Sequence, residues 1–213
     1  MFIRLFRVFG ILTTPFDLVV PAAATTYCQT LWQTYQFVFN VSRPRRTRLG
    51  DFRVLPNGQT QITVNADLSP EAFLITYVHE VAHAHVHKYA KRRVAPHGPA
   101  WQKAFQQLMQ PLLHEGVFPM PILQPLQLYL QKPAATTAGY VPLMLALQQQ
   151  QAGPETQMPA NRMRLSDLAE GAPFLFNKKT FVRRTLRRTR VVCKEVSTGR
   201  LYAILAHAWV ETI

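Results

Sequence analysis

The chain has 213 residues, of which 48% are hydrophobic and 16% are charged, so it can bury the core of one sizeable domain plus a small one. Its 24 lysines and arginines outnumber 11 acidic residues, and the net charge of +13 favours a polyanionic partner such as a nucleic acid. Only two cysteines occur, Cys28 and Cys193, which excludes a disulfide framework and a zinc ribbon with paired cysteines and suits a reducing cytoplasm.

The first 20 residues superficially resemble a secretory signal, because Arg4 and Arg7 lie close to an apolar stretch. Pro15 and Asp17 interrupt that stretch, and an aspartate is costly in a membrane. We therefore interpret residues 1–20 as an N-terminal extension. No segment offers the roughly 20 uninterrupted apolar residues of a spanning helix, so we expect a cytoplasmic protein without a membrane partner.

A first domain is expected over residues 21–132. It begins with an amphipathic helix that ends near Gln36, as the spacing of its aromatic and aliphatic residues indicates. A β-hairpin follows, in which residues 49–54 and 59–65 form the strands and Asn57-Gly58 forms the turn.

The next helix carries the most informative motif. Ser69 is a suitable N-cap and Pro70 fits the first helical position, so we expect a helix from residue 71 to about residue 91. Pro96 lies in the following loop, and Gly98-Pro99 begins a further helix.

The composition changes after residue 132. Residues 133–164 are rich in Ala, Thr, Pro and Gln, and we expect a loosely packed connector around one short helix over residues 143–147. Residues 165–213 are expected to form a small basic antiparallel β domain without the cysteines of a zinc ribbon. Its strand-like runs are residues 174–176, 180–182, 190–193 and 201–204.

The motif His-Glu-Val-Ala-His occupies residues 79–83 of the predicted helix. Residues four apart share a helix face, so the imidazoles of His79 and His83 can reach one metal ion. Zinc accepts neutral imidazole, and three protein ligands leave its fourth position for water. Glu80 is then placed to act as the general base that activates this water for attack on a peptide carbonyl. The apolar residues around the motif favour a metal, because burying these polar groups unpaired would be costly.

The third ligand must come from elsewhere in the chain. His85 lies about 200° around the helix from His83 and should face away. His87 is one turn beyond His83, and three histidines in a row would spread over too long a rise, so it is expected to be a partly exposed polar residue.

His97 is the preferred third ligand. If the helix ends by about residue 92, the five following residues can span roughly 16–17 Å and return to the metal. His114 and His207 remain alternatives, each with an ordinary explanation as a helix-end or β-surface residue.

Four sequence runs together resemble the SprT-like domain family, which includes bacterial SprT proteins and the DNA-dependent protease Spartan. The runs are RLGDFR (48–53), ITVN (62–65), LSPEAFLITYVHEVAH (68–83) and HGPAW (97–101). The similarity covers about residues 20–130.

The resemblance implies an α+β, zincin-like fold of the minigluzincin type, with the HExxH motif on an active-site helix beside a small antiparallel sheet. It also implies one zinc ion held by His79, His83 and His97, with Glu80 catalytic. Because the Spartan branch cleaves proteins crosslinked to DNA, a protein substrate and single-stranded or damaged DNA are the partners expected by analogy.

The end of the chain departs from this pattern. Bacterial SprT proteins often end in a zinc ribbon, whereas Cys193 stands alone here, so no second zinc is expected. The basic tail offers candidate nucleic-acid-binding residues instead, with a solvated basic face as the plain alternative. These candidates are Arg183, Arg184, Arg187, Arg188 and Arg190.

Three functions are therefore considered. The first is a zinc metalloendopeptidase that acts on DNA-associated or DNA-crosslinked proteins. The second is a nucleic-acid-binding module with a structural or vestigial zinc site. The third is a metal-dependent endoribonuclease, for which the carboxylate of Glu80 is less suitable than for peptide hydrolysis.

Overall fold

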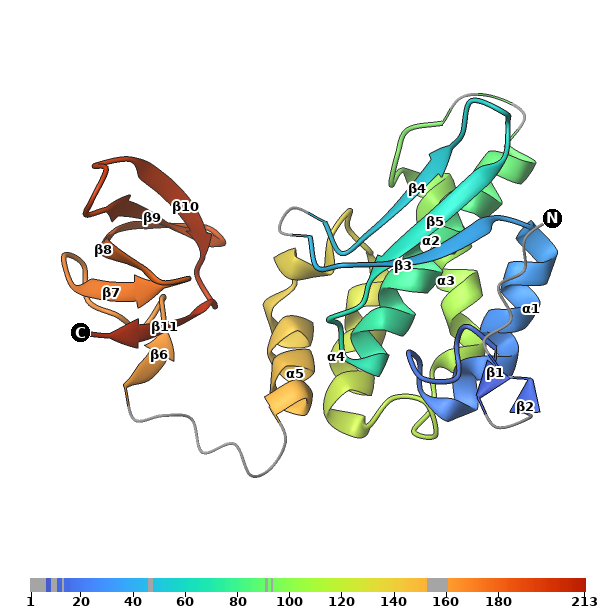
Figure 1. Cartoon of the computed structure of the whole chain (residues 1–213), viewed down its shortest axis with the longest axis horizontal. Coiled ribbons are helices and arrows are strands. Elements are labelled where there is room, and N and C mark those ends of the chain that lie inside the picture. Colours follow the sequence, from blue (N-terminus) through green and yellow to red (C-terminus); the bar gives the residue numbers. More distant parts are fainter. Residues whose placement is uncertain are drawn as a thin grey trace. The chain divides into compact units, whose positions relative to one another are not determined.

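The protein is α+β, and its contacts divide the chain into two compact units, Met1–Gln151 and Ala152–Ile213 (Figure 1). The computed structural model describes residues 7–8, 11–12, 14–45, 48–90, 92, 94–152 and 161–213. Arg4, which belongs to the segment that resembles a secretory signal, lies outside the described residues. So do residues 153–160, which form the centre of the expected connector.

A three-stranded mixed sheet underlies the first unit. Strands β3 (Val38–Ser42), β4 (Gly50–Val54) and β5 (Thr60–Asn65) lie in the order β3-β5-β4. The predicted hairpin is confirmed, because β4 and β5 are antiparallel. The expectation of an antiparallel sheet is wrong as a whole, since β3, which the sequence did not reveal, is parallel to β5.

The end of α1 (Thr25–Tyr35) explains where β3 begins. Gln36 adopts a left-handed conformation with φ 53°, and its N–H bonds to the Trp32 carbonyl at 2.8 Å. A left-handed residue at this position ends a helix, as was predicted near Gln36. The chain then continues in an extended conformation as β3, in which the apolar Val38, Phe39 and Val41 do not alternate regularly with polar residues, so no period of two marked the strand in the sequence.

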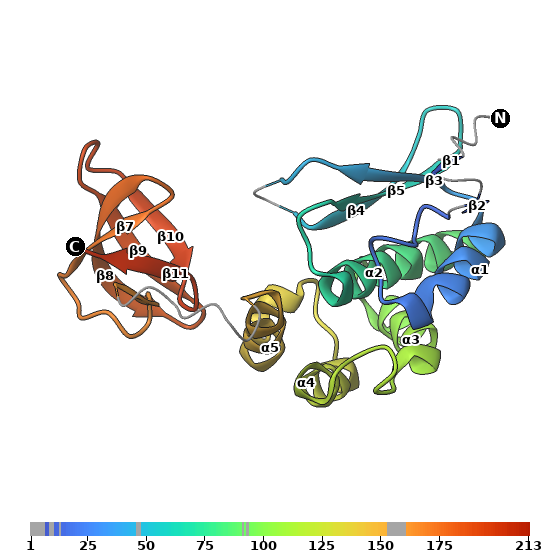
Figure 2. The same ribbon diagram turned by 60° about the horizontal axis from the view of Figure 1, so that its bottom comes forward.

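The central helix α2 (Pro70–Tyr89) begins as predicted, because the Ser69 hydroxyl accepts a hydrogen bond from the Ala72 N–H at 3.3 Å. It packs against β4 and β5 on one side and against α1 and α3 (Pro99–Met109) on the other (Figure 2). The helix is therefore almost entirely buried along its middle, which holds the motif of residues 79–83 in the interior of the unit.

No helix in the described part of the chain is long and apolar enough to cross a membrane. Shorter elements and two further helices complete the first unit. They are β1 (Arg7–Val8), β2 (Ile11–Leu12), the 3-10 helices Ala22–Ala24, Gln110–Leu112 and Thr137–Gly139, α4 (Met120–Gln131) and α5 (Val141–Ala152).

Helix α5 shows that part of the segment expected to be a loosely packed connector is packed into the first unit. It is longer than the predicted helix over residues 143–147, and Leu143, Ala146 and Leu147 are buried in the core of the first unit. Their spacing of three and four places them on one helix face, which packs rather than remaining loose. Phe16 and Val20, assigned to the N-terminal extension, belong to the same core.

The second unit is a six-stranded antiparallel sheet with a separate core. The strands are β6 (Arg162–Arg164), β7 (Pro173–Phe176), β8 (Lys179–Arg187), β9 (Arg190–Glu195), β10 (Leu201–Leu205) and β11 (Trp209–Thr212), in the order β10-β9-β8-β7-β11-β6. The four predicted strand-like runs correspond to β7 through β10, whereas β6 and β11 were not predicted. Because β6 pairs with β11, this sheet begins before residue 165.

Candidate metal centre

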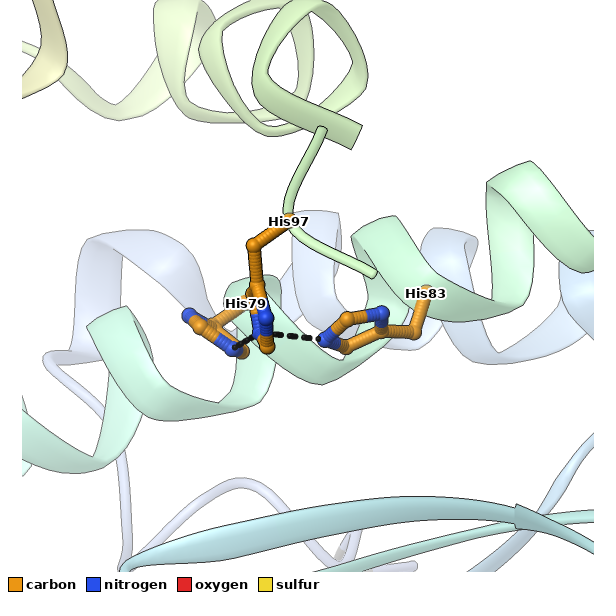
Figure 3. Close-up of side chains that lie close together, drawn as sticks. All are labelled: His79, His83 and His97. Carbon is orange, nitrogen blue, oxygen red and sulfur yellow. Dashed lines mark hydrogen bonds between the residues drawn. The ribbon is translucent and has the colours of Figure 1, made fainter. Parts of the chain in front are cut away.

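Three histidines converge on one point of the first unit (Figure 3). His79 and His83 project from α2, and His97 reaches them from the loop that leads into α3. The His97 Nε2 atom lies 3.1 Å from His79 Nε2 and 3.0 Å from His83 Nε2. Their potential ligand atoms all lie within 4.8 Å of one another, the only such group of three found among the described residues.

The backbone after α2 brings His97 back to the helix. Ala90 leaves the helix in an extended conformation with ψ 119°, and the Gly98 N–H closes a turn onto the Ala95 carbonyl at 3.0 Å. His97 itself is left-handed, with φ 56°, which is uncommon outside glycine. Such conformations persist where the surroundings hold them, and they gather at functional sites.

The other histidines considered as ligands lie elsewhere. His85 Nδ1 is 2.8 Å from the Tyr35 hydroxyl, and the His87 ring faces Phe52 at 5.7 Å between centroids. His114 is exposed, and His207 is buried in the second unit.

The donor set fits a divalent metal such as zinc. Two nitrogens bound tetrahedrally at roughly 2.0–2.1 Å lie about 3.3–3.4 Å apart, close to the separations found here. Burial, reinforced by the neighbouring imidazoles, lowers the pKa of His79 to about 3 and that of His83 to about 4. Burial also lowers the pKa of His97. All three rings are therefore neutral at physiological pH, which is the form that binds metal.

Aromatic side chains hold these rings in place. Trp101 is 1% exposed, and its ring centroid lies 4.6 Å from that of His79 and 4.7 Å from that of His97. Its indole N–H also donates to the His79 carbonyl at 3.3 Å. Phe52 of β4 stacks on His83 at 6.3 Å. Neither aromatic residue was predicted to contribute to the site.

Glu80 faces the sheet beside the three histidines. It is 6% exposed, and it shares the lining of a pocket of about 180 Å³ with His79 and Gly50. Burial raises the pKa of Glu80 to about 8, and the Asp51 carboxylate adds to this rise, whereas the Phe52 backbone N–H and Arg45 oppose it. The carboxyl group is thus within reach of a molecule bound next to His79.

Gly50 makes room for this carboxyl group. A Cβ atom at Gly50 would lie 2.8 Å from Glu80 Oε1 and 2.8 Å from Thr76 Cγ2, which is too close for any other residue without a shift. A glycine inside a strand often marks such a close approach. Gly50 is therefore the signal of this close approach that the sequence contains.

A buried polar network surrounds Asn65, the last residue of β5. Asn65, 1% exposed, donates from Nδ2 to the carbonyls of Arg48 at 3.0 Å and Arg45 at 3.3 Å. Its Oδ1 accepts a hydrogen bond from Arg45 Nε at 2.8 Å, and the same guanidinium pairs with Asp51. The network therefore positions the residues that approach Glu80.

The predicted nucleic-acid residues separate into two groups. Arg183 is 8% exposed and lies 3.5 Å from a Glu170 carboxylate oxygen, so its side chain is not on the surface, contrary to prediction. The inward-facing register of β8 explains this burial, because Arg183 pairs with the buried Cys193. The exposed members are Arg184, Arg187, Arg188 and Arg190, on the β8–β9 hairpin.

Comparison with known proteins agrees with the geometry. Residues 22–121 match the model of the SprT-like family, and this range contains the mixed sheet, α2 and the three histidines. No curated protein and no solved structure matched the chain. Residues 22–121 of this chain belong to the SprT-like family.

Proposed function

We propose that the first unit is a zincin-like, zinc-dependent endopeptidase in which His79, His83 and His97 hold the metal and Glu80 transfers protons. The observation that carries the proposal is the convergence of three neutral imidazoles next to a buried carboxyl group. A bound zinc ion would lower the pKa of water and polarise a peptide carbonyl.

Glu80 would accept a proton from the attacking water and return it to the leaving amine. Burial favours its protonated form, with a pKa of about 8. A cation held by the neighbouring histidines would favour the carboxylate instead, because opposite charges stabilise each other. Glu80 would then be ready to accept a proton at neutral pH.

The free edge of β4 supports a peptide as the substrate. β4 is an outer strand of its sheet. The Leu49 carbonyl accepts a hydrogen bond from the Asn65 N–H at 2.9 Å, and the Leu55 N–H donates to the Gln59 carbonyl at 2.7 Å, so both residues direct these groups toward β5. The alternation of an antiparallel pair therefore turns the backbone groups of Gly50, Phe52 and Val54 outward, where the Phe52 N–H already bonds to the Glu80 carboxyl group and the other groups of this edge face away from β5. An extended peptide can add to such an edge through main-chain hydrogen bonds, which would bring its carbonyl beside Glu80.

The decisive experiment is the change Glu80→Gln in the zinc-loaded protein. The amide has the same shape but cannot take a proton, so we expect one zinc per chain and a loss of peptide cleavage of about 10²- to 10⁴-fold. Metal content is measured by elemental analysis and cleavage on an unfolded protein substrate. His97→Ala should lower the zinc content, whereas the exposed His114→Ala serves as its matched control. Undiminished cleavage by Glu80→Gln would reject this mechanism.

A second function, nucleic-acid binding by the second unit, is favoured by the β8–β9 hairpin. Arg187 lies directly opposite Arg190, and like charges in that position destabilise a hairpin. None of the ion pairs among the described residues involves these two residues or Arg184 and Arg188. A phosphate backbone would relieve the repulsion. DNA-bound proteins would then be natural substrates of the first unit.

The salt dependence of DNA binding tests this second function. Each phosphate contact contributes about 0.7 (single strand) to 0.9 (duplex) to the slope of log affinity against log salt. Replacing Arg184, Arg187 and Arg188 with glutamine should lower that slope by about 2–3. Arg162→Gln is the control, because Arg162 pairs with Glu211 at 2.9 Å. An unchanged slope in the triple variant would remove the hairpin from consideration.

A further inference from the structure

Two hollows of unequal size flank the three histidines. The larger has a volume of about 470 Å³ and is lined in part by His83 and His97. The smaller, of about 180 Å³, is lined in part by His79 and Glu80. Because the potential metal ligands are divided between the two hollows, a peptide bond held at the metal centre would have one hollow on each side.

The larger hollow suits a large apolar side chain. Its volume lies within the roughly 300–1,000 Å³ of typical ligand pockets. Its apolar lining includes Phe52, Val86, Ala90, Val94, Pro96 and Trp101. Arg92 also lines it, and no acidic residue does among those described, so a lysine or arginine side chain would meet the like charge of Arg92 without an acidic partner.

The smaller hollow restricts the residue on the other side. Gly50, Thr76 and Ala135 contribute to its lining, together with the buried Glu80. Its volume is below the usual range for ligand pockets. Glycine, alanine or serine fits this space better than a long or aromatic side chain.

The direction of β4 assigns the hollows to the two sides of the cleaved bond. Gly50 lines the smaller hollow and Phe52 the larger, so β4 runs from the smaller to the larger. A peptide on the free edge of β4 would pair antiparallel, which is the slightly more stable arrangement. It would therefore place its N-terminal side at the larger hollow.

We infer that this protein cleaves after a large apolar residue and before a small one, and that it disfavours lysine and arginine at the first of these positions. The inference rests on the proposed peptidase function and names the substrate class of that site.

A peptide library cleaved by the zinc-loaded full-length protein tests the inference, with the cut positions read by mass spectrometry. We expect Phe, Leu or Met to be enriched on the N-terminal side of the cut and Gly, Ala or Ser on the C-terminal side. Cleavage without this preference, or with it reversed, overturns the inference and leaves the peptidase in place. No cleavage by protein that contains stoichiometric zinc overturns both.

Filling the larger hollow provides the second measurement. Ala90→Trp should lower the ratio of kcat/KM for a Phe-containing peptide to that for a Gly-containing peptide by about 10- to 100-fold. Val94→Trp, at a second position that lines the larger hollow, should also lower this ratio. Tyr89→Trp is the matched control, because Tyr89 is 56% exposed and does not line the hollow. Zinc content and thermal unfolding establish that each variant is folded, and an unchanged ratio in both folded Trp variants contradicts the inference.

Discussion

Gly50 of β4 and Glu80 of α2 lie so close together that the position of the Glu80 carboxyl group requires a residue without a side chain at position 50. The missing side chain of Gly50 leaves space that the Glu80 carboxyl group occupies, since an added Cβ would lie 2.8 Å from Glu80 Oε1. The same close approach buries Glu80 and raises its pKa. The placement of the carboxyl group that we propose as catalytic thus depends on an atom that is absent from a neighbouring strand.

Gly50→Ala is expected to displace the Glu80 carboxyl group without removing the histidines. A shift of about 1 Å in a reacting group can reduce the rate about 10²-fold, so we expect a loss of this order in cleavage and an unchanged zinc content. Kinetic assays and metal analysis measure the two effects. Gly139→Ala is the control, because a Cβ there meets no atom within 4 Å. Full activity in Gly50→Ala would mean that Glu80 tolerates the extra methyl group.

At the scale of an element, the local sequence specified where α2 begins, whereas strands β3, β6 and β11 depended on pairing with distant strands. Ser69 and Pro70 mark the N-terminus of α2 by chemistry that acts within one turn. β3 carries no comparable mark, because it is defined by pairing with β5, more than 20 residues away in the register Val38↔Gln61. β6 and β11 were missed for the same reason, since each depends on the other.

The loop between β10 and β11 is expected to make the second unit sensitive to acid. His207 is 5% exposed, and neither ring nitrogen has a hydrogen-bond partner within the described structure. Burial lowers the pKa of His207, and Arg164 adds to this effect. The unfolded chain takes up a proton below about pH 6.5 that the folded unit does not bind, so stability should be complete above that pH and decline below it.

His207→Phe should remove this decline between pH 6.5 and 5. It replaces the ionisable ring by one of similar shape and eliminates two unpaired nitrogens. Amide hydrogen-exchange protection of β8 to β11, compared at the two pH values, measures the effect. Glu195 does not interfere, because hydrogen bonds from Lys179 and Thr198 lower its pKa to about 2. A wild-type protein equally stable at both pH values would contradict the assignment to His207.

On the scale of the whole molecule, the buried hydrophobic residues form two separate cores. The core of the first unit ends at Leu147, and that of the second begins at Leu165. The three converging histidines and the residues that line both hollows all belong to the first unit. The exposed hairpin arginines belong to the second unit. A cytoplasmic location stays a prediction from composition, and a DNA partner stays a prediction from the net charge and from the family resemblance.

A fragment of residues 1–152 should therefore fold, bind one zinc ion and retain peptide cleavage within about twofold, because its core is self-contained. It should lose the salt-sensitive DNA binding of the full chain. Metal analysis, thermal unfolding and DNA titration compare the fragment with the intact protein. An aggregated or metal-free fragment would show that residues 153–213 are needed for the first unit to fold.

The sequence by itself determined the features that arise within a few residues. It specified the i, i+4 spacing of His79 and His83, the position of Glu80 between them, the hairpin turn and the cap of α2, because helix geometry and turn chemistry act locally. It also named His97 as the third histidine of the group, since the reach of a short loop can be calculated from chain length.

Only the tertiary structure decided which distant residues surround that motif. The closeness of Gly50 to Glu80, the network around Asn65, the burial of Arg183 and the packing of α5 depend on contacts across elements. Residue type alone does not disclose such contacts, because the same arginine or glycine can face solvent or core according to strand register.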